Sequence, residues 1–217
     1  MHWRDLKAYL RARGVRGVIR ALITRFVYRC EERYVTVRRL EDAIPELPAP
    51  DGVVIRQAAA ADVEAIQKAA VTDGWWQRCA ELSHWVRQGY PVGIAEHDDR
   101  VVGYACVIPN DALRDRLVAG AVDAGPGDAW GADAFVARPY RGRGVYPAIG
   151  AAVLKKARAQ GYRRVLSTIA VDGNAALSAH TKTGVRVVGK IHIFRLMWWN
   201  RTTFSRIGGG SHQSNSA

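Results

Sequence analysis

The stretch FVARPYRGRGVYPAIGAAVL, residues 135–154, decides the fold, because a strand pattern, a glycine loop and an Ala-rich helix follow one another within it. Gly142 and Gly144 permit positive φ and close backbone approach, and the free amides and dipole of the helix start attract an anion. Pro147 suits the first helical turn, where its missing N–H loses nothing. The loop also contains three arginines that can contact a pyrophosphate: Arg138, Arg141 and Arg143. We interpret the stretch as a phosphate-binding loop, with an ordinary glycine turn as the alternative.

Strand and helix patterns alternate on both sides of this loop. Strands are predicted at 53–58, 91–97, 101–108, 130–137, 163–170 and 186–199, and helices at 61–70, 77–88, 147–160 and 175–183. The turn DDR at 98–100 predicts an antiparallel hairpin, whereas the strand, helix and strand of 130–170 predict a parallel crossover. The fold class is therefore α/β (α+β), with a mixed sheet flanked by helices.

The N-terminal part is predicted to be a basic helical extension. Two helices are expected at 3–13 and 15–31, followed by a short strand at 34–38. Apolar residues at three- and four-residue spacing give the second helix one apolar stripe, and its arginines lie mostly outside that stripe. Such a helix can pack on its own domain, form a homodimer contact or lie on a membrane surface.

Two further boundaries follow from composition. The segment AIPELPAP, residues 43–50, is Pro-rich and separates an extension at 1–50 from a domain at 51–200. Residues 201–217 end in GGGSHQSNSA and are expected to be a flexible tail, because they offer little to bury.

The charge and cysteine content limit the function classes. The net charge is +12, and residues 137–217 carry 14 Lys/Arg against one acidic residue, which suits an anionic ligand. No nucleic-acid-binding motif accompanies the basic residues, so no nucleic-acid partner is expected. Three cysteines without a CxxC pair argue against a zinc site or a disulfide framework, and no metal is expected. The same cysteines indicate reduced thiols, so a cytoplasmic protein is expected. No apolar run reaches the roughly 20 residues of a membrane span, which predicts a soluble protein.

The loop RGRGVY resembles the R/Q-x-x-G-x-G/A signature of the GNAT acetyltransferases, with Arg141 and Gly144 in the first two fixed positions. The segment from Asn174 to Gly184, which includes His180 and Lys182, is similar to a second pattern of that family. The resemblance covers about residues 52–198. It implies a GNAT-like, mostly antiparallel sheet and acetyl-CoA, or another acyl-CoA, as cosubstrate.

The resemblance also implies how the cosubstrate is held. The pantetheine arm enters a split between two strands and pairs with the backbone of three residues: Ala134, Phe135 and Val136. Amides of the loop hold the pyrophosphate, which assigns cofactor binding to Arg141, Gly142, Arg143, Gly144, Val145 and Tyr146. Asn174 contacts the arm from the other side.

This chain departs from the family pattern at three positions. Tyr146 stands where the signature has Gly or Ala, so its ring must point away from the phosphates or toward the acceptor pocket. Val185 replaces the usual Phe, and Trp130 stands where an acidic residue is often found. A general base therefore cannot be transferred from the family.

Two catalytic residues are nevertheless predicted. His180 occupies the position where related sequences place a tyrosine general acid, and a packing histidine is the alternative. Asp133 lies on the strand beside the expected thioester and can accept a proton, unless it is simply solvated. Four tryptophans could line an acceptor pocket, although burial in the core is the more common fate: Trp75, Trp76, Trp85 and Trp130.

The sequence thus predicts an acyl-CoA-dependent N-acyltransferase that acts on a primary amine of a small molecule, for which an amino sugar is one candidate. An N-acyl amino acid synthase that uses an acyl carrier protein is a second hypothesis, because the basic last third suits an acidic carrier. A non-catalytic membrane or nucleic-acid adaptor is a third.

Overall fold

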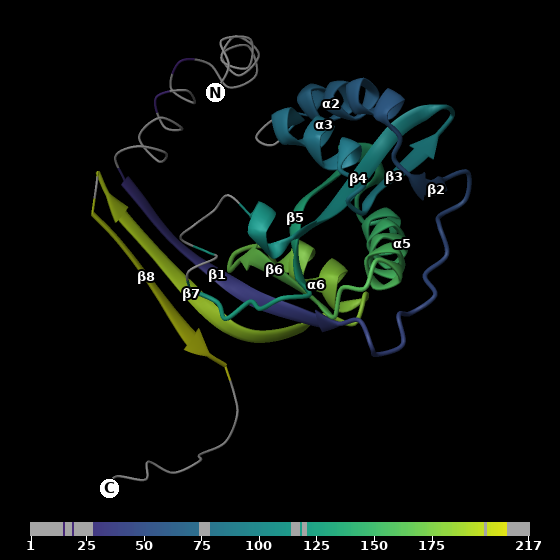
Figure 1. Ribbon diagram of the computed structural model, residues 1–217. Coiled ribbons are helices and arrows are strands. Elements are labelled where there is room, and N and C mark those ends of the chain that lie inside the picture. The colour runs from purple at the N-terminus through teal and green to yellow at the C-terminus, as the bar shows by residue number, and fades with distance from the viewer. Residues whose placement is uncertain are drawn as a thin grey trace, which may run out of the picture.

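In the computed structural model, residues 15, 19, 28–73, 79–113, 118, 121–197 and 199–207 are described. They form one eight-stranded sheet in the order β2-β3-β4-β5-β6-β1-β7-β8 (Figure 1). The strands are β1 (Tyr28–Arg39), β2 (Val54–Gln57), β3 (Val92–His97), β4 (Arg100–Pro109), β5 (Asp128–Val136), β6 (Arg164–Ala170), β7 (Arg186–Leu196) and β8 (Trp199–Arg206). The helices are α2 (Val63–Thr72), α3 (Cys79–Arg87), α5 (Val145–Ala159) and α6 (Asn174–Thr181), with short 3-10 turns at Ala60–Asp62, Asn110–Ala112 and Arg138–Tyr140.

The sheet is mixed and mostly antiparallel, as predicted. Only the β5–β6 pair is parallel, and α5 makes the connection between these two strands. The predicted hairpin joins β3 to β4, and its turn residues Asp98 and Asp99 have φ of 49° and 56°. Two consecutive left-handed residues are typical of a two-residue turn that matches the twist of the strands.

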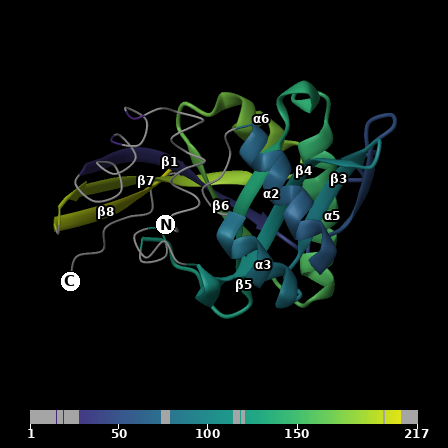
Figure 2. The ribbon, with the colours of Figure 1, turned by 90° about the horizontal axis from the view of Figure 1, so that it is seen from above.

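Helices cover both faces of the sheet. α2 and α3 lie on one face and α5 on the other, which Figures 1 and 2 show from two directions. The core under α2 and α3 includes Trp85 and Trp130, each 2% exposed, which confirms the core position for these two tryptophans. Trp75 and Trp76 lie outside the described residues. The second core lies between α5 and the sheet, around Ile149.

The predicted N-terminal organisation is wrong for residues 28–31, which were assigned to a helix. They begin β1, which runs to Arg39 and pairs antiparallel with β6 on one side and with β7 on the other. This strand therefore lies inside the sheet. Of the preceding residues only Val15 and Ile19 are described; both are helical and exposed, by 63% and 51%.

The C-terminal prediction also needs correction, because residues 201–206 were assigned to the tail. They belong to β8, which pairs antiparallel with β7 from Leu196↔Trp199 to Gly189↔Arg206. The rest of the predicted tail, residues 208–217, lies outside the described residues. None of the helices in the described part of the chain has the length and apolar character needed to cross a bilayer.

Candidate active site

The sheet splits between β5 and β6. These strands pair only over Asp128–Trp130 and Arg164–Leu166, after which β5 stays with β4 and β6 stays with β1. One extra residue in β5, Ala132, shifts the register against β4, and such a bulge bends its strand. The edge of β5 that faces β6 is consequently not paired with β6 from Ala134 to Val136.

A cavity of about 770 Å³ occupies this split. Its walls come from β5, β6, the start of α5 and α6, together with the loop between β5 and α5. The walls contain the predicted residues Asp133, Ala134, Phe135, Val136, Arg141, Gly142, Gly144, Val145, Tyr146 and His180. Two predicted residues, Arg143 and Asn174, are exposed and do not belong to the described cavity wall.

The loop before α5 has the backbone that its glycines predict. Gly142 and Gly144 have φ of 75° and 87°, and Gly144 is the N-cap of α5. A Cβ at either position would meet nothing within 4 Å, so the backbone faces open space. No side chain caps this helix start in the described structure, which leaves its first amides available to an anion.

Arg141 holds the shape of this loop. Its Nε donates a hydrogen bond of 2.7 Å to the carbonyl oxygen of Val136, and its guanidinium lies 3.5 Å from a carboxylate oxygen of Asp73. The same carboxylate accepts a hydrogen bond of 2.7 Å from the backbone N–H of Arg138. The end of α2 and the loop are thereby joined, and the loop has a fixed support on the α2 side.

The free edge of β5 carries the three residues that were predicted to pair with the pantetheine arm. Ala134, Phe135 and Val136 pair with β4 on their other side and line the cavity. Within this edge, the N–H of Ala134 donates a 3.0 Å hydrogen bond to the carboxylate of Asp133. The remaining backbone groups of the edge offer an extended ligand the hydrogen bonds of a strand.

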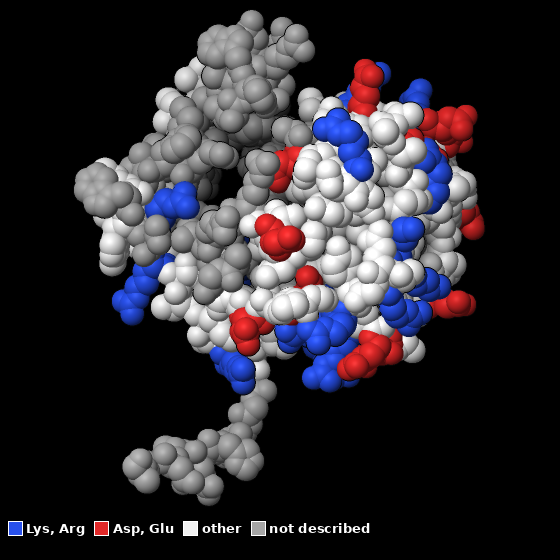
Figure 3. Space-filling view, viewed as in Figure 1, with Lys and Arg blue, Asp and Glu red and all other residues white. Residues whose placement is uncertain are grey.

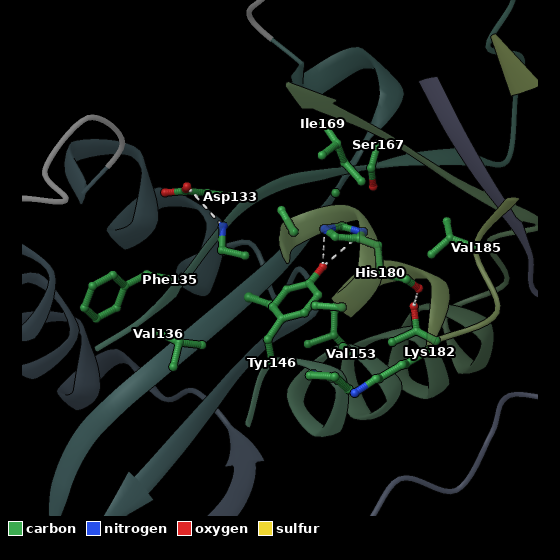
Figure 4. A pocket seen from close by; sticks show the side chains of 18 of the residues that line it. Asp133, Phe135, Val136, Tyr146, Val153, Ser167, Ile169, His180, Lys182 and Val185 are labelled. Carbon is green, nitrogen blue, oxygen red and sulfur yellow. Dashed lines mark hydrogen bonds between the residues drawn. The ribbon is translucent and has the colours of Figure 1, made fainter. Parts of the chain in front are cut away.

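Tyr146 and His180 meet inside the cavity. The hydroxyl of Tyr146 lies 2.7 Å from Nε2 of His180, and the two ring centroids are 4.8 Å apart (Figure 4). The ring of Tyr146 therefore points into the cavity toward α6. Burial lowers the pKa of His180 to about 4, so the imidazole is neutral at neutral pH. Burial, followed by the nearby thiol of Cys106, raises the pKa of Tyr146 and keeps the phenol protonated.

Asp133 stands on the opposite, β5 side of the cavity (Figure 4). One carboxylate oxygen accepts a 2.6 Å hydrogen bond from the hydroxyl of Tyr104, a residue that is 1% exposed. Sequence reasoning missed Tyr104, because its pairing with Asp133 follows from the register of β4 and β5. The carboxylate is held by this hydrogen bond, and Asp133 lines the cavity.

The charged residues of the cavity wall are mostly basic. Asp133 is its only acidic residue among those described, whereas four basic residues line it: Arg33, Arg38, Arg141 and Lys182. Arg38 is 6% exposed and donates hydrogen bonds to the carbonyl oxygens of Gly184 and Ala43. No sequence signal pointed to Arg33 or Arg38, because their place at the cavity follows from the pairing of β1 with β6 and β7. A polyanion is the ligand that this wall favours.

A metal centre is not formed by the described residues, where no three His, Cys, Asp or Glu side chains gather. Cys30 and Cys106 form no disulfide with each other; Cys30 is exposed and Cys106 is buried.

Comparison with known proteins agrees with this geometry. Residues 58–185 match the sequence profile of the acetyltransferase (GNAT) family, whose members use acetyl-CoA. The GCN5-related N-acetyltransferase from Sphaerobacter thermophilus has a TM-score of 0.59 at 18% identity; the match covers 90% of this chain and 58% of that one. A fungal GCN5-related glucosamine N-acetyltransferase region matches with a TM-score of 0.54 at 14% identity, over 83% of this chain and 23% of that one. The Salmonella typhimurium protein yncA, whose structure was solved with acetyl-CoA, matches with a TM-score of 0.48 at 20% identity. This match covers 77% of this chain and 99% of that one. No protein with a curated function matches the sequence.

Proposed function

We propose that this chain, which belongs to the acetyltransferase (GNAT) family, transfers an acyl group from an acyl-CoA, foremost acetyl-CoA, to the primary amine of a small molecule. One observation carries the proposal. The split between β5 and β6 opens into the same cavity as the uncapped, glycine-lined start of α5. Such a cavity offers backbone pairing to an extended arm and an anion site to a diphosphate at its end.

The donor is proposed to bind along the β5 side of the split. Backbone groups of Ala134, Phe135 and Val136 would pair with the pantetheine amides. The amides of Gly142 to Tyr146 would receive the pyrophosphate. Arg143, which lies outside the cavity with its guanidinium 6.0 Å from the ring centroid of Tyr140, is available to the outer phosphates. Asn174 is proposed to contact the donor from α6, whose start lies beside the cavity-lining Gly173 and Ala175.

Asp133 is proposed to accept the proton that the acceptor ammonium must lose before it attacks the thioester carbonyl. Tyr104 donates a hydrogen bond to one oxygen of this carboxylate, the Ala134 N–H donates one to the other, and Asp133 lines the cavity. Attack by the neutral amine forms the C–N bond, and collapse of the tetrahedral adduct breaks the C–S bond. The departing thiolate takes one proton, so the transfer is balanced without a metal or an oxidant.

His180 is proposed to act at the departing thiolate together with Tyr146. Because His180 is neutral at neutral pH, it is a weak acid by itself, and its hydrogen bond instead orients the hydroxyl of Tyr146. That hydroxyl can stabilise the developing thiolate by hydrogen bonding. A thiol with a pKa of about 8.5 is a fair leaving group, so strong acid catalysis is not required.

Calorimetric titration with acetyl-CoA tests the donor site, and Gly144→Glu is the decisive variant. A carboxylate at the anion site should abolish binding. Gly161→Glu is the matched control, because Gly161 lies just beyond the other end of α5, has φ of 86° and likewise has nothing within 4 Å of a Cβ. Binding by G161E and not by G144E supports the proposal. Equal binding by both folded variants contradicts the loop assignment.

The acceptor is proposed to be a small-molecule amine, with an amino sugar as one candidate. The amino-sugar hypothesis draws support from the fungal structure named for glucosamine, although a likeness at 14% identity shows the fold alone. Incubating the protein with labelled acetyl-CoA and a library of amines, followed by mass spectrometry, identifies the acceptor class. Replacing acetyl-CoA by a long-chain acyl carrier protein tests the synthase hypothesis, for which the cationic C-terminal third is the supporting observation.

A further inference from the structure

The hairpin tip between β7 and β8 exposes large apolar side chains. The sequence there is Leu196-Met197-Trp198-Trp199. Leu196, Met197 and Trp199 are 45%, 48% and 56% exposed. Tyr28, the first residue of β1, pairs with Leu196 and is 46% exposed. Four large apolar residues thus gather, uncovered, at one end of the sheet, which we call the apolar tip (Tyr28, Leu196, Met197 and Trp199).

Contacts between aromatic rings hold the side chains of the apolar tip in place. The ring of Phe194 makes edge contacts with Tyr28 at 5.9 Å and with Trp199 at 5.4 Å, so three rings form a row across β1, β7 and β8. Met197 has φ of 50°, a conformation that favours glycine or asparagine in turns. The chain therefore keeps an exposed methionine where local backbone preference would select a small polar residue.

Positive charge surrounds this end of the sheet. Arg201 follows the tip in the sequence and is exposed. Lys and Arg side chains lie along the edge of the molecule that β7 and β8 form (Figure 3). Asp172 is the last acidic residue of the chain. In β1, Glu31 and Glu32 lie further along the strand from the tip and pair with Arg33 and His192.

We propose that the apolar tip is a membrane contact that inserts into the interface of a bilayer containing anionic lipids. Tryptophan, tyrosine and methionine partition into the boundary between head groups and acyl chains, while adjacent arginines meet the lipid phosphates. β1 also starts at this end, and the two described residues before it, Val15 and Ile19, are apolar and exposed. A second copy fits less well, because two tips placed together would bring their flanking arginines together.

Vesicle sedimentation with the full chain tests the proposal. Vesicles of phosphatidylcholine alone are compared with vesicles that also contain phosphatidylserine, at low and at physiological salt. We expect the wild type to bind the anionic vesicles and to release partly as salt is raised. Trp199→Ser and Met197→Ser should each weaken binding about tenfold. The exposed half of each apolar side chain moves from water into the lipid when the wild type binds, and serine does not make this contribution. Arg201→Ser should weaken binding about fivefold, and only on anionic vesicles.

Two matched controls separate this surface from general effects. Val54→Ser removes an apolar side chain that is 59% exposed on β2, at the opposite edge of the sheet. Arg206→Ser removes an exposed arginine from the far end of β8. Both controls should bind vesicles like the wild type. Because the tip does not line the cavity, all of the variants should bind acetyl-CoA as the wild type does, which also reports that they are folded.

Three results would overturn the proposal. The first is a wild type that does not bind anionic vesicles at low salt. The second is binding by W199S, M197S and R201S that equals the binding of the two controls. The third is a wild-type dimer in sedimentation equilibrium that W199S converts to a monomer without any change in vesicle binding, since the tip would then join two copies.

Discussion

Protonation of His180 should destabilise the folded protein as the pH falls from about 6.5 to about 4. Burial lowers the pKa of this imidazole to about 4 in the folded protein, whereas in the unfolded chain the imidazole has its ordinary pKa of about 6.5. Between these values the unfolded chain binds a proton that the folded chain does not bind, so stability rises with pH across the window. About 2.5 pH units at 1.36 kcal/mol each amount to roughly 3 kcal/mol.

Urea denaturation of the wild type and of His180→Gln, repeated from pH 7.5 to pH 4, measures this effect. The stability of the wild type relative to H180Q should fall by roughly 3 kcal/mol across the series, because glutamine does not titrate. Tyr146→Phe should keep the dependence, since burial and not the hydrogen bond depresses the pKa. The reasoning is refuted if the wild type and H180Q lose stability in parallel.

Two further predictions concern the supports of the cavity. Arg164→Ala removes the two hydrogen bonds, of 2.9 and 2.5 Å, that the guanidinium donates to the carboxylate of Asp128, which is 1% exposed, and should cost roughly 3 kcal/mol at pH 7. Burial opposes ionisation of Asp128, but hydrogen bonds from Arg164 and from the Gly125 amide lower its pKa, so the loss should shrink below pH 4; urea titrations at pH 7 and pH 3 check this. Gly93→Ala would place a Cβ 2.7 Å from Cγ2 of Val153 on α5 and should lower stability by about 1–3 kcal/mol. Calorimetry of G93A with and without Val153→Ala tests that contact; a double variant as unstable as the sum of the two single variants would contradict it.

The donor side of the candidate site could be predicted from the sequence, because the residues that determine its backbone lie close together in the chain. Gly142, Gly144 and Pro147 fix the backbone of the loop within a few residues, and the structure has the positive φ values and the helix start that they predict. The hairpin at Asp98 and Asp99 was predicted for the same reason.

The opposite wall of the cavity could not be predicted from local signals. The contact between Tyr146 and His180 joins residues on two different helices, and the bond between Tyr104 and Asp133 depends on the register of two strands. Neither periodicity nor spacing encodes such pairs. The departure at Tyr146 was visible in the sequence, but only the fold shows that its hydroxyl meets an imidazole.

Two parts of the sheet were assigned wrongly, the start of β1 and most of β8. Residues 28–31 continue an apolar and basic pattern that fits a helix, and only pairing with β6 and β7 makes them a strand. Residues 201–206 read RTTFSR, and their β-branched and aromatic residues were a strand signal that the following Gly- and Ser-rich residues obscured. Tertiary pairing outweighed local propensity in both places.

The central position of β1 has a consequence for biosynthesis. This strand leaves the ribosome well before its two neighbours, because Arg39 aligns with Arg164 of β6 and Tyr28 aligns with Leu196 of β7. Until then the nascent chain carries a strand with two unsatisfied edges, and closing contacts of such sequence separation is slow. A chain that stops short of residue 186 would lack one neighbour of β1 altogether, and its sheet would end in an open, aggregation-prone edge.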